Sequence, residues 1–120
     1  MLKDLVKKCR SYRRFFQEVS IPYEDLKDMV DTARLTGCTK NCQGLKFKLI
    51  STPEECAKVF PSLLWAGALK DWDGPADGER PSAYVLVLED LSIGKNLMWD
   101  EALFPRRSCF LLLRRDMAAV

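Results

Sequence analysis

The sequence predicts an α+β fold in which helices pack around a small mixed sheet. Apolar residues recur at helical spacing in the first third of the chain, which favours amphipathic helices. Residues 45–50 alternate apolar and basic side chains, and residues 83–88 form a continuous apolar run, so both segments are typical of strands. A chain of 120 residues has room for one domain with a single core.

Two helices are predicted before the first strand. The apolar positions of the first helix, over residues 2–9, are Leu2, Leu5, Val6 and Cys9. The second is expected to begin near Ser20 and Pro22, because a serine, an early proline and following acids are typical of a helix start. We expect it to run to about Leu35 and to end before Gly37. Its apolar face consists of Leu26, Met29, Val30 and Ala33.

The middle of the chain is predicted to hold a strand, a short helix and a long loop. Residues 45–50 should be half-buried, since basic side chains alternate with apolar ones. Ser51–Glu55 is a capped helix start, and we expect that helix to reach about Phe60, followed by a short helical turn. Residues 67–81 form a long loop in which Trp72 favours order.

The end of the chain is predicted to hold a buried strand, a further helix and an atypical tail. The apolar run at 83–88 should be buried on both faces, and a helix is expected from Asp90 to Trp99. Ten lysines precede residue 101 but none follows it, and two Arg-Arg pairs there flank a solid apolar block. We interpret residues 1–101 as part of one domain and residues 102–120 as a tail out of frame. If one lost base is restored in the coding sequence just after the codon of Glu101, one permitted translation of the tail is an amphipathic helix that ends in glycine. The alternative is a genuine basic C-terminal tail.

Composition excludes several classes of function. The net charge of +2 gives no strong field that would attract nucleic acid or anionic lipid. No apolar stretch approaches the roughly 20 residues that span a bilayer. The chain has no histidine, which removes Ser-His and Cys-His catalysis, and its five irregularly spaced cysteines favour neither a disulfide framework nor a metal site. Met1–Asp4 does not resemble a signal peptide, so we expect a cytoplasmic protein without nucleic-acid or membrane partners.

Two segments point to a cofactor. Arg10–Phe15 holds three arginines beside Ser11, and fixed cations beside a hydroxyl suit a phosphate. About thirty residues on, Asn41 and Gln43 offer side-chain amides, which suit the donor and acceptor edge of a flat heterocycle. Together the segments predict a bound nucleotide-like cofactor that supplies the chemistry.

The chain resembles the nitroreductase family of FMN-dependent oxidoreductases over residues 2–101, about the N-terminal half of a usual member. Three motifs in order support the resemblance: Arg10–Phe15, the loop Thr36–Gln43 before a strand, and the stretch Trp65–Pro81. The loop departs from the family at Gly37-Cys38, where Pro-Ser is usual, and after Gln43, where Pro-Trp is usual. The resemblance implies a partial nitroreductase-like fold that lacks the C-terminal half, which supplies more sheet and much of the dimer.

The resemblance also implies roles for the two cofactor segments. Arg10 and Arg13 would hold the phosphate, ribityl or pyrimidine oxygens of FMN, with Ser11 donating a hydrogen bond, and Asn41 and Gln43 would bind the isoalloxazine edge. NAD(P)H would pass hydride to the flavin, and a small-molecule acceptor such as a nitroaromatic or a quinone would take the electrons. No side chain is then catalytic itself. Full-length members are expected to be homodimers, and this shorter chain to be weakly active or inactive alone.

Each candidate residue also has a purely structural interpretation. The arginines suit a solvated helix end, because cations are favourable at a helix C-terminus. The two amides suit the capping of their own loop. Trp65, Lys70 and Trp72 either line the substrate side of the flavin or pack a long loop. Arg14 is expected to be exposed, and Cys38 and Cys42 to be small apolar loop residues.

A rival function belongs to another class. A small non-enzymatic binding protein could use a basic N-terminal patch, together with the arginines of the tail, against an acidic partner or nucleic acid. The patch consists of Lys7, Lys8, Arg10, Arg13 and Arg14. A third possibility is an unstable fragment whose exposed strand edges and apolar tail promote aggregation.

Overall fold

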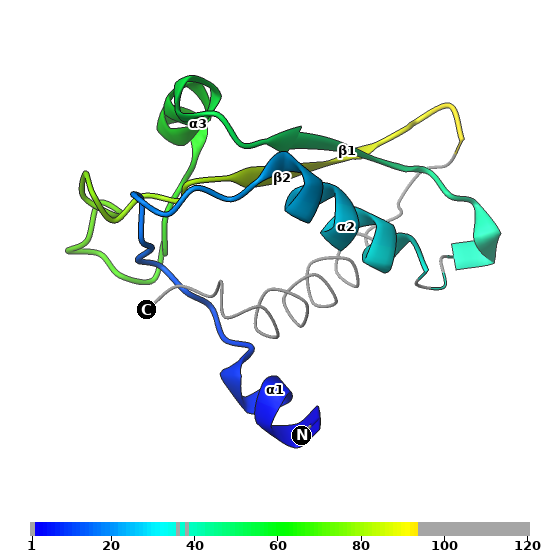
Figure 1. Ribbon diagram of the computed structural model, residues 1–120, viewed down its shortest axis with the longest axis horizontal. Coiled ribbons are helices and arrows are strands. Elements are labelled where there is room, and N and C mark those ends of the chain that lie inside the picture. Colours follow the sequence, from blue (N-terminus) through cyan, green and yellow to red (C-terminus); the bar gives the residue numbers. More distant parts are fainter. Residues whose placement is uncertain (1, 36, 38, 94–120) are drawn as a thin grey trace.

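The structure is a computed structural model that describes residues 2–35, 37 and 39–93 (Figure 1). It is of the α+β class, with helices beside a two-stranded antiparallel sheet. The elements, in order, are α1 (Leu2–Lys8), α2 (Tyr23–Arg34), the 3₁₀ turn η1 (Thr39–Asn41), β1 (Leu45–Ile50), α3 (Pro53–Val59), the 3₁₀ turn η2 (Phe60–Ser62) and β2 (Tyr84–Glu89). A mixed sheet was expected, but the described strands form an antiparallel pair alone.

The core lies where α2 packs against β1. Leu26, Met29 and Ala33 follow the i, i+3, i+7 spacing of one helix face and are 2%, 3% and 4% exposed. On the strand, Ile50 is 2% exposed. Burying a large apolar side chain contributes about 1.5–3 kcal/mol, so each of the larger residues here stabilises the fold. The predicted apolar face of the second helix is therefore confirmed at these three positions, while its fourth residue, Val30, is half-buried.

The ends of α2 differ from those predicted. Pro22 is the N-cap residue, and no described side chain caps the helix, so Ser20 has no capping role. The Pro22 carbonyl accepts hydrogen bonds from the backbone N–H groups of Asp25 and Leu26, at 3.0 and 3.3 Å. At the other end, Leu35 keeps a right-handed conformation as the C-cap. The helix therefore ends before Gly37 without a left-handed glycine cap.

The two strands pair along their full length, from Leu45 opposite Glu89 to Ile50 opposite Tyr84. Lys46 and Lys48 are exposed, as the alternating pattern predicted. Directly opposed residues share a face of the sheet, so Leu88 lies on the face of Lys46, and it is 51% exposed. The prediction that residues 83–88 are buried on both faces is therefore wrong, because solvent reaches the face that carries the lysines.

The helix predicted from Ser51–Glu55 to about Phe60 is confirmed, since α3 spans Pro53–Val59. The Thr52 hydroxyl of the N-cap residue accepts a hydrogen bond from the backbone N–H of Glu55 at 3.4 Å, and Pro53 opens the helix. The turn η2 follows directly, where a short helical turn was expected. The long loop then leads back to β2 (Figure 1).

After β2 the chain makes a turn in which the backbone N–H of Ile93 donates to the Asp90 carbonyl at 3.0 Å. A helix was expected from Asp90, but the described residues at its start form this turn; residues 94–99 and the tail at 102–120 lie outside the described residues. Among the described residues, no helix is both long and apolar enough to cross a bilayer.

Candidate functional site

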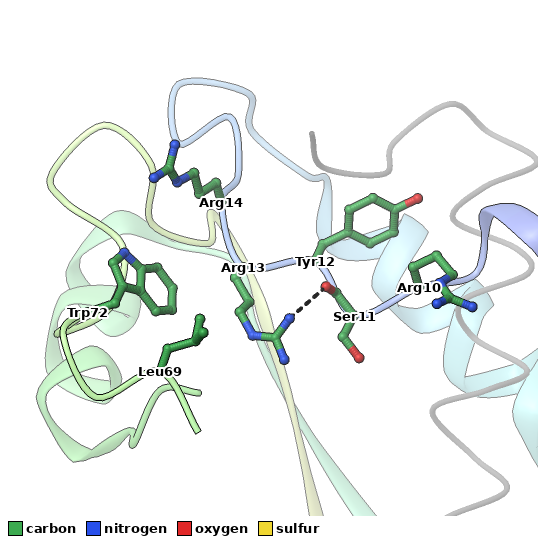
Figure 2. Close-up of a pocket in the computed structure, with 7 residues that line it drawn as sticks. All are labelled: Arg10, Ser11, Tyr12, Arg13, Arg14, Leu69 and Trp72. Atoms are coloured by element: carbon green, nitrogen blue, oxygen red, sulfur yellow. Dashed lines mark hydrogen bonds between the residues drawn. The ribbon is translucent and has the colours of Figure 1, made fainter. Parts of the chain in front are cut away.

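A cavity of about 430 Å³ lies between the N-terminal segment and the long loop (Figure 2). Five consecutive residues, Arg10–Arg14, form one wall, and Leu69 and Trp72 form the other. We call these the arginine wall and the apolar wall. The cavity therefore brings three of the predicted cofactor residues together, Arg10, Ser11 and Arg13.

The three arginines differ in their partners. Arg13 donates from Nη1 to the Ser11 carbonyl at 3.3 Å, and its side chain reaches between Leu69 and Ser11 (Figure 2). Arg14 lies with its Nε 3.7 Å from Glu79 Oε2 and is exposed, as expected. Arg10 makes no hydrogen bond or ion pair with the other residues that the structure describes. A guanidinium has five N–H donors, so Arg10 and Arg13 keep donors for an anion.

The arginine wall begins where α1 ends, and Tyr12 fixes this junction. Its hydroxyl donates to the Lys8 carbonyl at 2.6 Å, which satisfies one of the backbone acceptors that the end of a helix leaves open. This bond holds the chain close to the helix end as it enters the cavity. No pattern in the sequence indicated a role for Tyr12 or Leu69, although both line the cavity.

The two tryptophans of the long loop have different places. Trp72 lines the cavity, whereas Trp65 packs against Phe15 and Phe60, at ring-centroid distances of 6.4 and 5.9 Å. Trp65 therefore packs against two aromatic residues, whereas Trp72 lines the cavity, and its place beside a flavin stays a prediction. Lys70 is exposed and does not contribute to the described wall.

The predicted amide pair lies elsewhere. Gln43 donates from Nε2 to Asn41 Oδ1 at 3.0 Å, and neither side chain lines the cavity. Figure 1 shows η1 at the end of α2 remote from the arginine segment. The 12 residues of α2 span about 18 Å, which keeps the two segments apart. The structure therefore does not bring Asn41 and Gln43 to one cavity with Arg10, Ser11 and Arg13 within a single chain.

The remaining candidates have plain surroundings. Cys42 is a half-buried free thiol, and Cys38 lies outside the described residues. In the described part of the chain, no group of three or more His, Cys, Asp or Glu side chains could hold a metal ion. The arrangement suits a ligand with an anionic group for the arginines and a flat or apolar part for Trp72.

In comparisons with known proteins, neither a family model nor a curated protein matches the chain. The function is therefore argued from the cavity and from the motifs that line it.

Proposed function

We propose that this chain is the N-terminal part of a nitroreductase-like, FMN-dependent oxidoreductase, and that its cavity takes the phosphate end of FMN. One observation supports this above all. Arg10, Ser11 and Arg13 of the first motif line a single cavity. Both guanidinium groups there keep N–H donors that no described residue uses. A charge-assisted hydrogen bond contributes about 1.5–3 kcal/mol, so two such contacts would hold a phosphate without a metal ion.

In this proposal the side chains of the protein bind and orient FMN, and the flavin carries out the reaction. Bound FMN would supply the hydride chemistry between NAD(P)H and an acceptor such as a nitroaromatic or a quinone. Arg10 and Arg13 would neutralise the phosphate or the pyrimidine oxygens, and Ser11 would donate a hydrogen bond. Trp72 and Leu69 would offer an apolar surface to a flat ring system.

The resemblance implies that Asn41 and Gln43 bind the same flavin, and a second copy of the chain would bring them to it. They lie apart from the arginine wall within one chain, and the resemblance implies a homodimer. The apolar side chains of α1 favour such an assembly, because Leu2 is 70% and Val6 is 52% exposed. We therefore propose that the amide loop of one chain faces the arginine wall of another.

Titration of FMN and riboflavin against the chain tests the proposed site, because the two flavins differ only in the phosphate. We expect weak binding that prefers FMN by about tenfold or more, the value of one charge-assisted contact. Arg10→Ala/Arg13→Ala should abolish this preference. Arg34→Ala is the control, because Arg34 is an exposed arginine that pairs with Asp31 outside the cavity.

Two results would contradict the proposal. Equal binding of FMN and riboflavin by the unaltered chain would remove the role of the arginine wall. Tight, stoichiometric flavin that copurifies with the chain would contradict the weak binding expected of a chain that resembles only the N-terminal half of the family.

A binding protein without enzymatic activity is the second candidate. The side chains of Lys7, Lys8 and Arg10 make no hydrogen bond or ion pair with the described part of the chain, so their charges are open to an acidic partner. Binding of an acidic peptide or an oligonucleotide that falls steeply with salt, together with no flavin preference, would favour this candidate.

A further inference from the structure

A single glutamine joins the chain that forms the arginine wall to the loop that forms the apolar wall. Gln17 Oε1 accepts hydrogen bonds from the backbone N–H groups of Gly78, at 2.7 Å, and Arg80, at 3.2 Å. Its Nε2 donates to Asp77 Oδ1 at 3.3 Å. One half-buried side chain therefore uses both its acceptor and its donor on a turn that lies 60 residues further along the sequence.

Backbone bonds beside Gln17 join the same two segments. The backbone N–H of Phe15 donates to the Glu79 carbonyl at 3.0 Å, and that of Gln17 donates to the Gly78 carbonyl at 3.3 Å. The Arg14–Glu79 ion pair, at 3.7 Å, is exposed and so contributes little to the stability of this junction by itself. The side-chain bonds of Gln17 are the part of this junction that a substitution can remove while the backbone pairing stays.

The junction lies directly beside the cavity on both segments. Arg14, the last residue of the arginine wall, is followed at once by Phe15–Gln17, and Trp72 precedes the turn at 77–80 by a few residues. The two walls come from segments far apart in sequence, so their separation depends on contacts between the segments. Gln17 supplies three of these contacts without lining the cavity itself.

We infer that Gln17 is a positioning residue, which sets the apolar wall of Leu69 and Trp72 against the arginine wall. Its effect on flavin binding rests on the proposed function, whereas its effect on the loop does not. An amide is needed at this position, because the side chain must accept from two N–H groups and also donate to a carboxylate. A glutamate would accept from both N–H groups but would face the carboxylate of Asp77 with like charge.

Three variants test this role through hydrogen exchange of the loop at 67–81. Gln17→Met removes all three bonds at similar volume, so the amides of Gly78 and Arg80 should exchange roughly five- to tenfold faster. Gln17→Glu should also accelerate exchange. Gln17→Glu/Asp77→Asn should restore slow exchange, because the new asparagine amide can donate to the new carboxylate. Lys48→Met is the control, since Lys48 is an exposed residue of β1 outside the cavity, and it should leave the exchange of residues 67–81 unchanged.

The amides of α2 serve as the internal reference, so that a variant with general unfolding is recognised by fast exchange there. Unchanged exchange of Gly78 and Arg80 in Gln17→Met would overturn the inference, and so would a double variant as fast as Gln17→Glu. The second readout is the FMN preference, which should fall in Gln17→Met and return in the double variant. If the loop responds as expected but the unaltered chain shows no flavin preference, the proposed function fails while the positioning of the loop stands.

Discussion

At the scale of single residues, Asp90 ties the first strand to the end of the second. Its carboxylate lies 2.7 Å from Lys46 Nζ and accepts hydrogen bonds from the Ser92 hydroxyl and backbone N–H, at 2.6 and 3.0 Å. The bond to Lys46, followed by those to Ser92, lowers the pKa of Asp90 from 3.8 to about 2. The charged form is therefore favoured in the folded state.

This lowered pKa predicts how stability depends on pH. A carboxyl group whose pKa is depressed on folding stabilises the fold above its ordinary pKa of 3.8, and this contribution is lost as the pH falls through about 2. Asp90→Asn should therefore be less stable than the unaltered chain at pH 7, with a difference that shrinks between these two values. Urea unfolding at a series of pH values measures this difference in the free energy of unfolding. A difference that stays constant down to pH 2 would contradict the account, and Asp31→Asn, in an exposed helix pair, is the control.

Cys56 should be the least reactive of the described cysteines. It is 8% exposed, its Sγ donates to the Ser82 carbonyl at 3.4 Å, and burial, together with the nearby Glu55 carboxylate, raises its pKa above 9.0. Because the thiolate is the reactive form, alkylation at pH 7.5 should be at least about tenfold slower at Cys56 than at Cys9. Mass spectrometry of peptides after timed alkylation resolves the sites. Equal rates would show that the thiol is accessible and unperturbed.

Single residues were predictable from the sequence only where the signal is local. The exposure of Arg14 follows from its charge, and the gathering of Arg10, Ser11 and Arg13 follows from their closeness in the chain. Gln17 gave no signal, because its partners lie 60 to 63 residues away and a lone glutamine is usually solvated. Long-range hydrogen bonds of this kind leave no periodic pattern in the sequence.

At the scale of elements, the loop at 67–81 shows why a stretch without regular structure can be well ordered. Gly74 has φ +112°, and a Cβ atom there would lie 2.7 Å from Trp65 Cδ1. The backbone therefore passes directly over the indole, in a conformation that glycine adopts easily. Trp65 in turn contacts Phe15 and Phe60, so the loop has a small aromatic cluster of its own.

Gly74→Ala should destabilise this loop. The added methyl group combines an unfavourable φ with a contact that forces Trp65 to move, and each effect costs about 1–3 kcal/mol. We expect a lower urea midpoint and a shifted tryptophan emission. Gly37→Ala is the control, because its Cβ would meet nothing within 4 Å, and it should change stability by less than about 0.5 kcal/mol. Equal stability of the two variants would contradict the close approach of Gly74 to Trp65.

Helices and strands with a periodic sequence pattern were predictable, but the neighbours that surround each element were not. The strand at 45–50 has the predicted bounds, because its basic and apolar residues alternate over a half-buried face. The burial of β2 was overestimated, since a continuous apolar run cannot show how many strands or layers surround it. The separation of the amide loop from the arginine wall depends on the direction of α2, which the sequence pattern does not contain.

At the scale of the whole molecule, the described chain leaves much apolar surface open. Its buried hydrophobic residues are Leu26, Met29, Ala33, Ile50 and Cys56, while α1, described in full, buries none of its seven residues. Figure 1 shows α1 at the edge of the described fold. A helix of this length is marginal in water without packing partners. A second copy of the chain would supply such a partner.

Self-association should therefore depend on α1. Sedimentation over a range of concentrations is expected to show a reversible dimer, and Leu2→Glu/Val6→Glu should weaken it at least about tenfold, because two exposed apolar contacts are lost. Leu64→Glu is the control, since Leu64 is 101% exposed and lies outside α1. A chain that remains monomeric at all concentrations would contradict the proposed assembly, and so would an equal effect of the two substitutions.

Phosphorus-31 NMR of FMN tests the central claim most directly, because it reports on the phosphate alone. When the chain is added, we expect the phosphate resonance to shift and broaden, and Arg10→Ala/Arg13→Ala should abolish the change while Arg34→Ala preserves it. A phosphate resonance that does not respond to the unaltered chain, or that responds equally to the double variant, would contradict the assignment of the arginine wall to the phosphate of FMN.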